Sequence, residues 1–347
     1  MDGQNLAPQT GNNFNLLRFV FASMVILSHC PELQHGNRSR EFLSNVFGTI
    51  SFGQLAVSSF FLLSGYLIVK SWDHNPRIVS YLRNRVLRIY PAFIVTTLVC
   101  AFVVGPMASE PHYFRHFYWD DFLTNMTLLQ SPAIPSVFQE TFYPLVNGAM
   151  WSIEYEFKCY LLVALFGLAI GFQNRVYWLV CFLAFTTMFL IDPYVGHGTF
   201  HDPIVRLGMM FTAGGCYFLY GRPFLDKQRW MVVALMLWAL LMFNRTLAQP
   251  AVAIFWGYAI LSFANRPARL FAWFNKLPDI SYGVYPYAWP ITKLLIEWQP
   301  EVGRLSLIVQ TWLWSILAGT LSWYLIEKRF ITMKAHAAPR PLVNQPA

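Results

Sequence analysis

The sequence predicts an all-α polytopic membrane protein with about ten transmembrane helices and both termini in the cytoplasm. Its 347 residues are 56% hydrophobic and only 12% charged, whereas soluble domains carry about 25% charged residues. The apolar residues form long blocks separated by short polar loops, and most lysines and arginines fall in alternate loops. We therefore expect one compact membrane domain without a second folded domain.

A helix needs about 20 apolar residues to cross the hydrocarbon core of a bilayer. Residues 1–13 lack lysine and arginine, and so lack the basic region of a cleaved signal peptide. We expect them to form a cytoplasmic segment before an uncleaved first helix. Residues 331–347 are polar and rich in proline and alanine, as in a disordered cytoplasmic tail. The membrane domain is expected over 14–330, with spans at 14–30, 49–70, 88–107, 147–170, 176–191, 204–219, 229–244, 250–264, 280–297 and 305–326.

Lysine and arginine in the loops set the orientation, because they are enriched on the cytoplasmic side. With a cytoplasmic N-terminus, 16 of the 25 basic residues fall in inside segments and 5 in outside loops. The long loop 108–146 is then outside, and carries His112, His116, Asp120 and Asp121. The net charge of +8 lies at the cytoplasmic membrane surface, which argues against a nucleic-acid partner.

The first span holds two ionisable side chains, Arg18 and His29, and such residues are rare and usually functional inside a membrane. They are eleven residues apart, about 20° past three full turns and about 16 Å along the axis. The two side chains therefore share one face, with Arg18 toward the cytoplasm and His29 in the outer half. Snorkelling of Arg18 to the interface and a packing role for His29 are the alternatives.

The fourth span begins WSIEYEFKCYLL, from Trp151. Glu154 and Lys158 are four residues apart and are predicted to form an ion pair. Glu156 has no cation four residues away, so it should be protonated or have a partner on another helix, for which His29 is a candidate. Two similar pairs are expected near the outer interface, Asp202 with Arg206 and Lys293 with Glu297.

The segment RVLRIYP, which precedes the third predicted span, carries Arg85 and Arg88 three residues apart. Guanidinium groups suit phosphate because they donate two parallel hydrogen bonds. The sequence therefore indicates a phosphate site on the cytoplasmic side, with lipid headgroups or topology alone as the alternative reasons for the basic cluster.

The five cysteines fall in or beside apolar blocks at no metal-ligand spacing. We interpret them as small buried hydrophobes and expect no metal site. Cys30 is adjacent to His29, and neighbours in a helix sequence do not face each other, so Cys30 is not expected to be a nucleophile. The cysteines are Cys30, Cys100, Cys159, Cys181 and Cys216.

Several motifs in order resemble the integral-membrane acyltransferase family 3, which includes bacterial O-antigen and polysaccharide O-acetyltransferases. Arg18 and His29 resemble its arginine, ten residues, histidine pattern, and Arg85 and Arg88 its R-x-x-R motif. The other similar motifs are SSFFLLSGYLI at 58–68, WSIEYEFKCYLL at 151–162 with the family glutamate at Glu156, SYGVYPYAWPI at 281–291 and WYLIEKRF at 323–330. Ala288 stands where many members have a histidine, so this chain departs from the family pattern at that position.

The resemblance implies a multi-pass protein of the bacterial inner membrane that transfers an acyl group, usually acetyl from acetyl-CoA, to a hydroxyl of a sugar or glycan acceptor. The acceptor is often presented from the periplasmic side, and a lipid-linked glycan is one candidate for it. In this interpretation Arg18, Arg85 and Arg88 bind CoA, which carries phosphates and is cytoplasmic.

An imidazole suits general-base chemistry, so His29 is expected to deprotonate the acceptor hydroxyl. Glu156 orients His29 or contacts the acceptor. Trp151, Ser152 and Tyr160 are candidate acceptor contacts, although Trp151 equally suits an aromatic belt at the interface. A transporter or flippase for an amphipathic solute is the alternative function, because intramembrane Arg, His and Glu also mark ion pathways.

Overall fold

The computed structural model describes residues 12–109, 113–169, 175–195, 203–225, 227, 229–266, 271, 273–274 and 279–330. In these ranges the chain is almost entirely helical and has no β-strand, apart from an isolated bridge between Ser109 and Val137. The all-helical class is therefore confirmed. The predicted tail 331–347 and most of the segment 1–13 lie outside the described residues.

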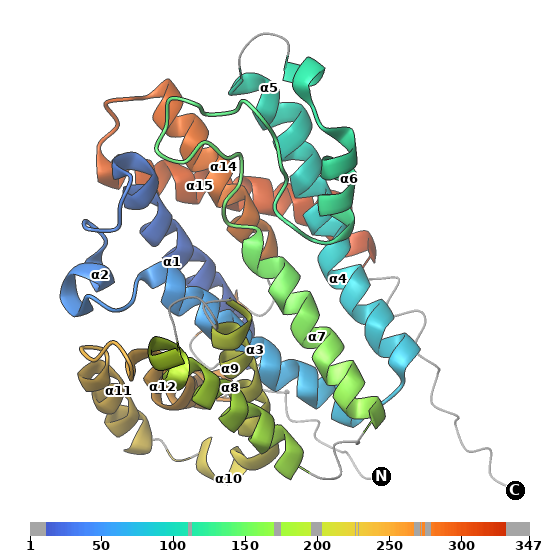
Figure 1. Cartoon of the computed structure of the whole chain (residues 1–347), viewed down its shortest axis with the longest axis vertical. Helices are drawn as coiled ribbons and strands as arrows, with labels where there is room; N and C mark the ends of the chain where they lie inside the picture. Colours follow the sequence, from blue (N-terminus) through green and yellow to red (C-terminus); the bar gives the residue numbers. More distant parts are fainter. Residues whose placement is uncertain are drawn as a thin grey trace, which may run out of the picture.

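All ten predicted spans coincide with helical segments (Figure 1). Within the described ranges, four helices are long and apolar enough to cross a membrane, namely Phe14–His35, Phe52–His74, Ile78–Met107 and Arg304–Phe330. The elements are α1 (Phe14–His35), α2 (Phe42–Phe47), α3 (Phe52–His74), α4 (Ile78–Val99), the π-helix η1 (Cys100–Val104), α5 (Gly105–Met107), the 3-10 helix η2 (Tyr113–His116), α6 (Trp119–Thr127), α7 (Trp151–Ala169), α8 (Val176–Val195), α9 (Pro203–Tyr220), α10 (Arg222–Leu225), α11 (Arg229–Leu241), α12 (Ala248–Ala251), the π-helix η3 (Val252–Trp256), α13 (Gly257–Ala264), α14 (Ser281–Trp298), α15 (Arg304–Ser322) and the π-helix η5 (Trp323–Glu327).

The third predicted span begins ten residues earlier than expected, because α4 starts at Ile78. Arg85 and Arg88 therefore lie inside this helix and not in a loop before it. Arginine and leucine are both good helix formers, so the basic residues continue the helix, which also runs past Pro91 to Val99. At about 1.5 Å per residue, Arg88 lies about 15 Å from the start of α4. Both arginines reach partners on other parts of the chain, Arg85 at Ser71 of α3 and Arg88 at Asp279 before α14.

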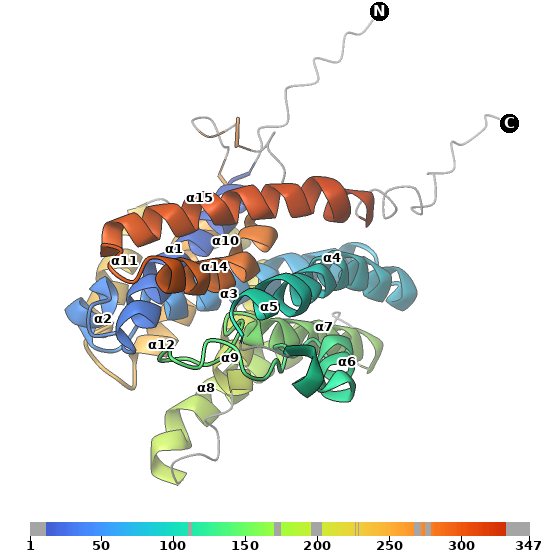
Figure 2. The ribbon, with the colours of Figure 1, turned by 90° about the horizontal axis from the view of Figure 1, so that it is seen from above.

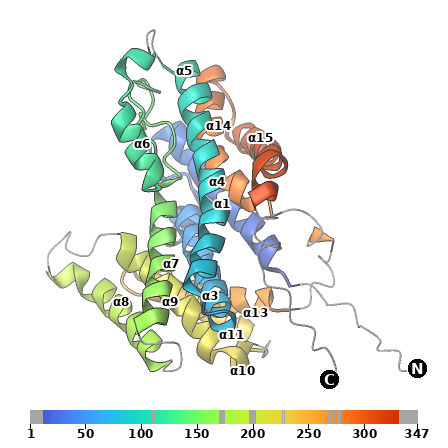
Figure 3. The same cartoon turned by 90° about the vertical axis from the view of Figure 1, so that its right-hand side faces the viewer.

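The helices lie in layers around α1, α3, α4 and α14 (Figure 2), with α15 on one side of them and α7, α9 and α8 on the other. Seen from the side, α4 runs along most of the molecule with α6 beside one half of it (Figure 3). Close packing at the centre depends on small residues, which let helix backbones approach. A Cβ atom on Gly65 of α3 would lie only 1.9 Å from the Phe211 carbonyl oxygen of α9, so this crossing requires glycine.

Helix α14 contains two prolines, Pro286 and Pro290. A proline has no backbone N–H, so Pro290 leaves the carbonyl of Pro286 without its usual helical donor. The Asn147 amide fills this role, because its Nδ2 donates to the Pro286 carbonyl oxygen at 2.8 Å. This bond ties the loop before α7 to the middle of α14, and so brings the start of α7 beside the SYG-containing helix.

Candidate active site

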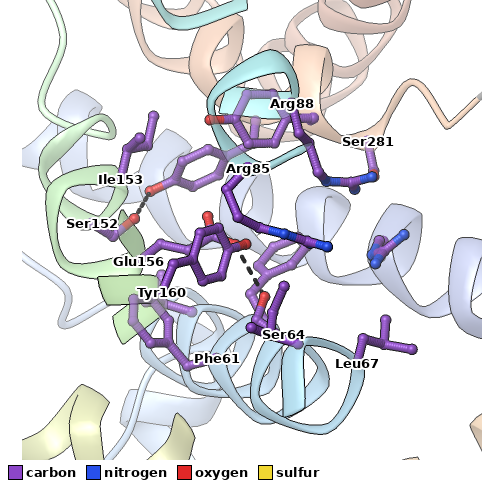
Figure 4. Close-up of a pocket in the computed structure, with 16 residues that line it drawn as sticks. Phe61, Ser64, Leu67, Arg85, Arg88, Ser152, Ile153, Glu156, Tyr160 and Ser281 are labelled. Atoms are coloured by element: carbon purple, nitrogen blue, oxygen red, sulfur yellow. Dashed lines mark hydrogen bonds between the residues drawn. The ribbon is translucent and has the colours of Figure 1, made fainter. Parts of the chain in front are cut away.

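A cavity of about 110 Å³ lies between α1, α3, α4, α7 and α14. Its wall combines three arginines, one carboxylate, six hydroxyl-bearing side chains and a set of apolar ones. Figure 4 shows the arginines of α4 and the polar residues of α7 extending into the same space. The lining residues are Arg18, Val57, Phe60, Phe61, Ser64, Leu67, Ile68, Arg85, Arg88, Ser152, Ile153, Glu156, Tyr160, Ser281, Tyr282 and Tyr285.

Two of the three arginines share a carboxylate that the sequence analysis missed. Asp279, just before α14, accepts from Arg18 Nη1 at 2.9 Å and from Arg88 Nη2 at 3.2 Å through the same oxygen, Oδ2. Burial alone raises the pKa of Asp279, but Arg18, Arg88 and the Ser281 hydroxyl outweigh it and lower the pKa to about 2. One anion thus partly neutralises two cations, and the cluster keeps a net positive charge.

Arg85 is held differently from the other two arginines. Its Nη2 donates to Ser71 Oγ at 3.1 Å, and its guanidinium lies over the rings of Tyr81 and Tyr160, at 5.5 and 5.7 Å. Among the described residues its Nε has no hydrogen-bond partner, and the same is true of the buried hydroxyl of Tyr282 in the same wall. Buried donors normally have partners, so the cavity offers unused hydrogen-bonding groups to a ligand.

Glu156 has partners other than His29, which corrects the candidate pairing of these two residues. Its Oε1 accepts from Ser64 Oγ of α3 at 3.0 Å and from the Tyr160 hydroxyl one turn further along α7. Neutral hydroxyl donors also satisfy a buried carboxylate, so Glu156 does not require a cation as its partner. Glu156 therefore belongs to the cavity wall near Arg85.

His29 lies outside the cavity lining, beside a carboxylate that the sequence analysis also missed. Its Nδ1 is 3.0 Å from Glu32 Oε2, and the other oxygen of Glu32 is 3.0 Å from Arg38 Nε. Trp289 of α14 packs edge-on against the imidazole, with ring centroids 4.9 Å apart. The signal was present in the sequence, since residues three apart on a helix are neighbours.

The cavity and the His29–Glu32 pair approach each other along α14. Tyr285 lines the cavity, and Trp289, which packs on His29, is one turn further along this helix. The Tyr285 hydroxyl donates to the Ala149 carbonyl, and lies 2.9 Å from Ser152 Oγ, which can donate to it. Among the α14 residues of the cavity lining, Tyr285 is thus the one closest in sequence to Trp289.

The structure brings together six of the eight residues that the sequence singled out. Arg18, Arg85, Arg88, Ser152, Glu156 and Tyr160 line one cavity, whereas His29 and Trp151 do not. Trp151 is half-buried and packs on Tyr155, with ring centroids 5.8 Å apart.

The other expected charge pairs had different outcomes. Glu154 and Lys158 form the predicted ion pair, at 2.7 Å. Lys293 is buried and donates to the Tyr143 carbonyl at 2.7 Å and to the Thr141 hydroxyl, so it anchors the 138–143 loop and is not simply an interfacial residue. Asp202 lies outside the described residues.

Three of the cysteines are fully buried as expected, and two are partly buried. The described residues contain no group of three or more His, Cys, Asp or Glu side chains that could hold a metal ion.

Apolar helices of membrane-spanning length around a cationic, hydroxyl-rich cavity indicate an integral membrane protein. The acyltransferase domain family, Acyl_transf_3, matches residues 12–327, so the chain belongs to this family of acyltransferases, as its ordered motifs indicated. No solved structure matches the chain.

Three relatives of known name are similar to it. An O-acetyl transferase of Shigella phage Sf6 is 26% identical over 335 residues, which cover 92% of this chain and 96% of that protein. Nodulation protein 10 of Rhizobium leguminosarum bv. viciae is 23% identical over 377 residues, or 95% and 96% of the two chains. Acyltransferase MdmB of Streptomyces mycarofaciens is 32% identical over 150 residues, or 42% and 36%.

Proposed function

We propose that this protein is an acetyl-CoA-dependent O-acyltransferase of the bacterial inner membrane that acylates a hydroxyl of a sugar or glycan. The observation that carries the proposal is the cavity in which Arg18, Arg85 and Arg88 converge. The relative named as an O-acetyl transferase supports acetyl as the group and oxygen as the acceptor atom. We further propose that residues 14–330 form one domain of ten spans with both termini in the cytoplasm.

The arginine cavity is proposed as the donor site. CoA carries several phosphates, and arginine binds phosphate through charge-assisted hydrogen bonds. Asp279 holds Arg18 and Arg88 in place before the donor arrives, which reduces the ordering cost of binding. Glu156 and Ser64 orient Tyr160, whose ring supports Arg85, so Glu156 acts on the donor side and not on His29.

The acyl transfer itself is assigned to the His29–Glu32 pair. With Nδ1 donating to Glu32, Nε2 carries the lone pair that accepts the proton of the acceptor hydroxyl. The deprotonated oxygen attacks the thioester carbonyl, a C–O bond forms, and the C–S bond breaks. The CoA thiolate leaves and takes up a proton, so the products are the ester and free CoA. Ser152 and Tyr285 then lie along the path from the donor cavity toward His29.

The test is to incubate the purified protein with labelled acetyl-CoA and a series of sugar acceptors, and to measure acceptor-dependent release of CoA. His29→Ala should lower kcat by about 10²–10⁴-fold, which is the usual contribution of a general base. His74→Ala, at the exposed end of α3, is the matched control and should keep normal turnover. Normal turnover in His29→Ala would remove the base assignment, and solute flux without CoA release would favour a transporter.

A further inference from the structure

A second cavity lies at the other end of α1 from Arg18, between α1, α2 and the start of α15. Its volume is about 580 Å³, and most of its lining is apolar. Two of the apolar side chains, Phe42 and Leu305, are 65% and 79% exposed. The apolar lining residues are Leu27, Pro31, Phe42, Phe52, Leu305 and Ile308. We call this cavity the outer groove, because the loop charges predict that this end of the bundle faces outward.

Two arginines, Arg40 and Arg304, lie at the outer groove. Arg304 Nη1 is 3.4 Å from the Arg40 carbonyl oxygen, and Arg40 Nη1 is 3.1 Å from His35 Nε2. Within the described part of the chain, neither arginine has a carboxylate within 4.0 Å. Arginine only donates hydrogen bonds, so His35 Nε2 accepts from Arg40 and the ring is neutral in this contact. The two guanidinium groups are thus the positive charges at this place, and among the described residues they have no anion.

The one acidic residue in the lining does not neutralise them. Glu41 is buried, and its Oε2 accepts from the Ser44 backbone N–H at 2.6 Å, at the start of α2. Its Oε1 accepts from the Phe52 backbone N–H at 3.0 Å, at the start of α3. Both oxygens are therefore committed to helix N-termini, and Arg40 and Arg304 remain available to an anion from outside the chain.

Membrane topology does not explain these arginines, because lysine and arginine are depleted from outer loops. Three of the five basic residues in the predicted outer loops, Arg38, Arg40 and Arg304, nevertheless occur at this end of α1. Arg38 is paired with Glu32, the residue that contacts His29. The outer groove and the proposed catalytic pair are therefore at the same end of α1.

We infer that the outer groove binds the lipid part of the acceptor, which is a glycan linked through phosphate or pyrophosphate to a polyprenyl chain. The chain lies against the apolar lining, and the phosphate is bound by Arg40 and Arg304. A sugar attached to that phosphate is then held at the end of α1, where His29 and Glu32 lie. This inference rests on the proposed function, since it names the class of acceptor that the acyltransferase uses.

The binding test uses farnesyl pyrophosphate as the probe and the full-length protein in phosphatidylcholine nanodiscs, which carry no net charge. The double variant Arg40→Gln, Arg304→Gln should bind the probe at least about 10-fold more weakly than wild type, because two charge-assisted contacts are lost. Arg115→Gln, an exposed arginine of the same predicted face outside the groove, is the matched control and should bind normally. Phe42→Ser should weaken binding of farnesyl pyrophosphate but not of inorganic pyrophosphate.

Equal probe binding by wild type and the double variant would overturn the inference. Displacement of the probe by phosphatidylglycerol at equal concentration would also overturn it, because the groove would then be a general site for anionic lipid. This binding measurement needs no acyl transfer, so it stands or falls separately from the proposed function.

A measurement of acyl-transfer activity further separates the lipid-binding inference from the proposed function. With acetyl-CoA as donor, the double variant should raise KM for farnesyl-pyrophosphoryl-N-acetylglucosamine and leave transfer to the methyl glycoside of N-acetylglucosamine unchanged. Loss of transfer to both acceptors by the double variant would contradict a lipid-binding role for the groove. Absence of transfer to both acceptors in wild type, with probe binding intact, would instead count against the proposed function alone.

Discussion

At the scale of single residues, the clearest addition to the site is Glu32, which contacts His29 and which we propose positions its ring. Glu32 is 6% exposed, and its two oxygens contact His29 and Arg38. A carboxylate on Nδ1 fixes the ring orientation and stabilises the imidazolium that forms during proton transfer, as in the Ser-His-Asp triad. His29 and Glu32 are therefore best understood as a dyad whose charge is balanced by Arg38.

We predict that Glu32→Gln lowers kcat by about 10-fold or more and leaves KM for acetyl-CoA unchanged. The glutamine keeps the shape of the side chain but removes the charge that stabilises the imidazolium. Steady-state kinetics with varied acetyl-CoA separates the two constants. Glu154→Gln, which breaks the surface pair with Lys158, should leave both unchanged. A rise in KM alone, or an unaltered kcat, would contradict the positioning role.

Arg88 is predicted to act on donor binding rather than on chemistry. Arg88→Gln should raise KM for acetyl-CoA by about 10- to 100-fold, since a hydrogen bond to a charged group contributes about 1.5–3 kcal/mol. Arg83→Gln provides the comparison, because Arg83 is on the same helix but is exposed and outside the cavity lining. If Arg88→Gln changed only the KM of the acceptor, the cavity would not be the donor site.

At the scale of elements, Asp279 joins three parts of the fold. It connects Arg18 of α1 and Arg88 of α4 to the chain that enters α14. Because a carboxylate that stays ionised is required for both contacts, the lowered pKa of Asp279, about 2, keeps the three elements linked at all physiological pH values.

We predict that Asp279→Asn destabilises the empty protein by about 1.5–3 kcal/mol, because two guanidinium groups lose their counter-ion. The folded pKa is below the unfolded value of about 3.9, so the stabilisation is present above pH 4 and is lost as the pH falls toward 2. Thermal unfolding should therefore show a constant difference between wild type and variant from pH 5 to 8. Added acetyl-CoA should restore part of the lost Tm of the variant, because its phosphates supply negative charge to the two arginines. A Tm difference between wild type and variant that changes between pH 5 and 8 would contradict the role assigned to the Asp279 carboxylate.

Sequence reasoning was strongest where the information is local to one helix. The helical segments, the Glu154–Lys158 pair and the membership of Arg85 and Arg88 in one cluster follow from periodicity and spacing. It failed where partners come from distant segments. Asp279 is 261 residues from Arg18, and Ser64 is 92 residues from Glu156, so no spacing rule connects them. Glu32 is the exception, because its i,i+3 relation to His29 was visible in the sequence.

At the scale of the whole molecule, the two proposed sites lie at opposite ends of α1. The donor cavity is at Arg18, near the start of α1, whereas the outer groove is lined by Leu27 and Pro31, in the second half of α1. A donor that enters from the cytoplasm and an acceptor held in the outer leaflet would then meet between them. This separation of the donor site from the acceptor site requires that the two ends of α1 face opposite sides of the membrane.

That requirement gives a prediction about topology. A cysteine introduced as Glu140→Cys, in the loop before α7, should react with a membrane-impermeant maleimide in intact cells, because the loop charges place this loop outside. Asn75→Cys, in the exposed turn between α3 and α4, should react only after the membrane is permeabilised. Unmodified protein measures the background from the five native cysteines, three of which are buried. The opposite labelling pattern would reverse the predicted orientation of the protein in the membrane, and would place the outer groove and its lipid on the cytoplasmic side.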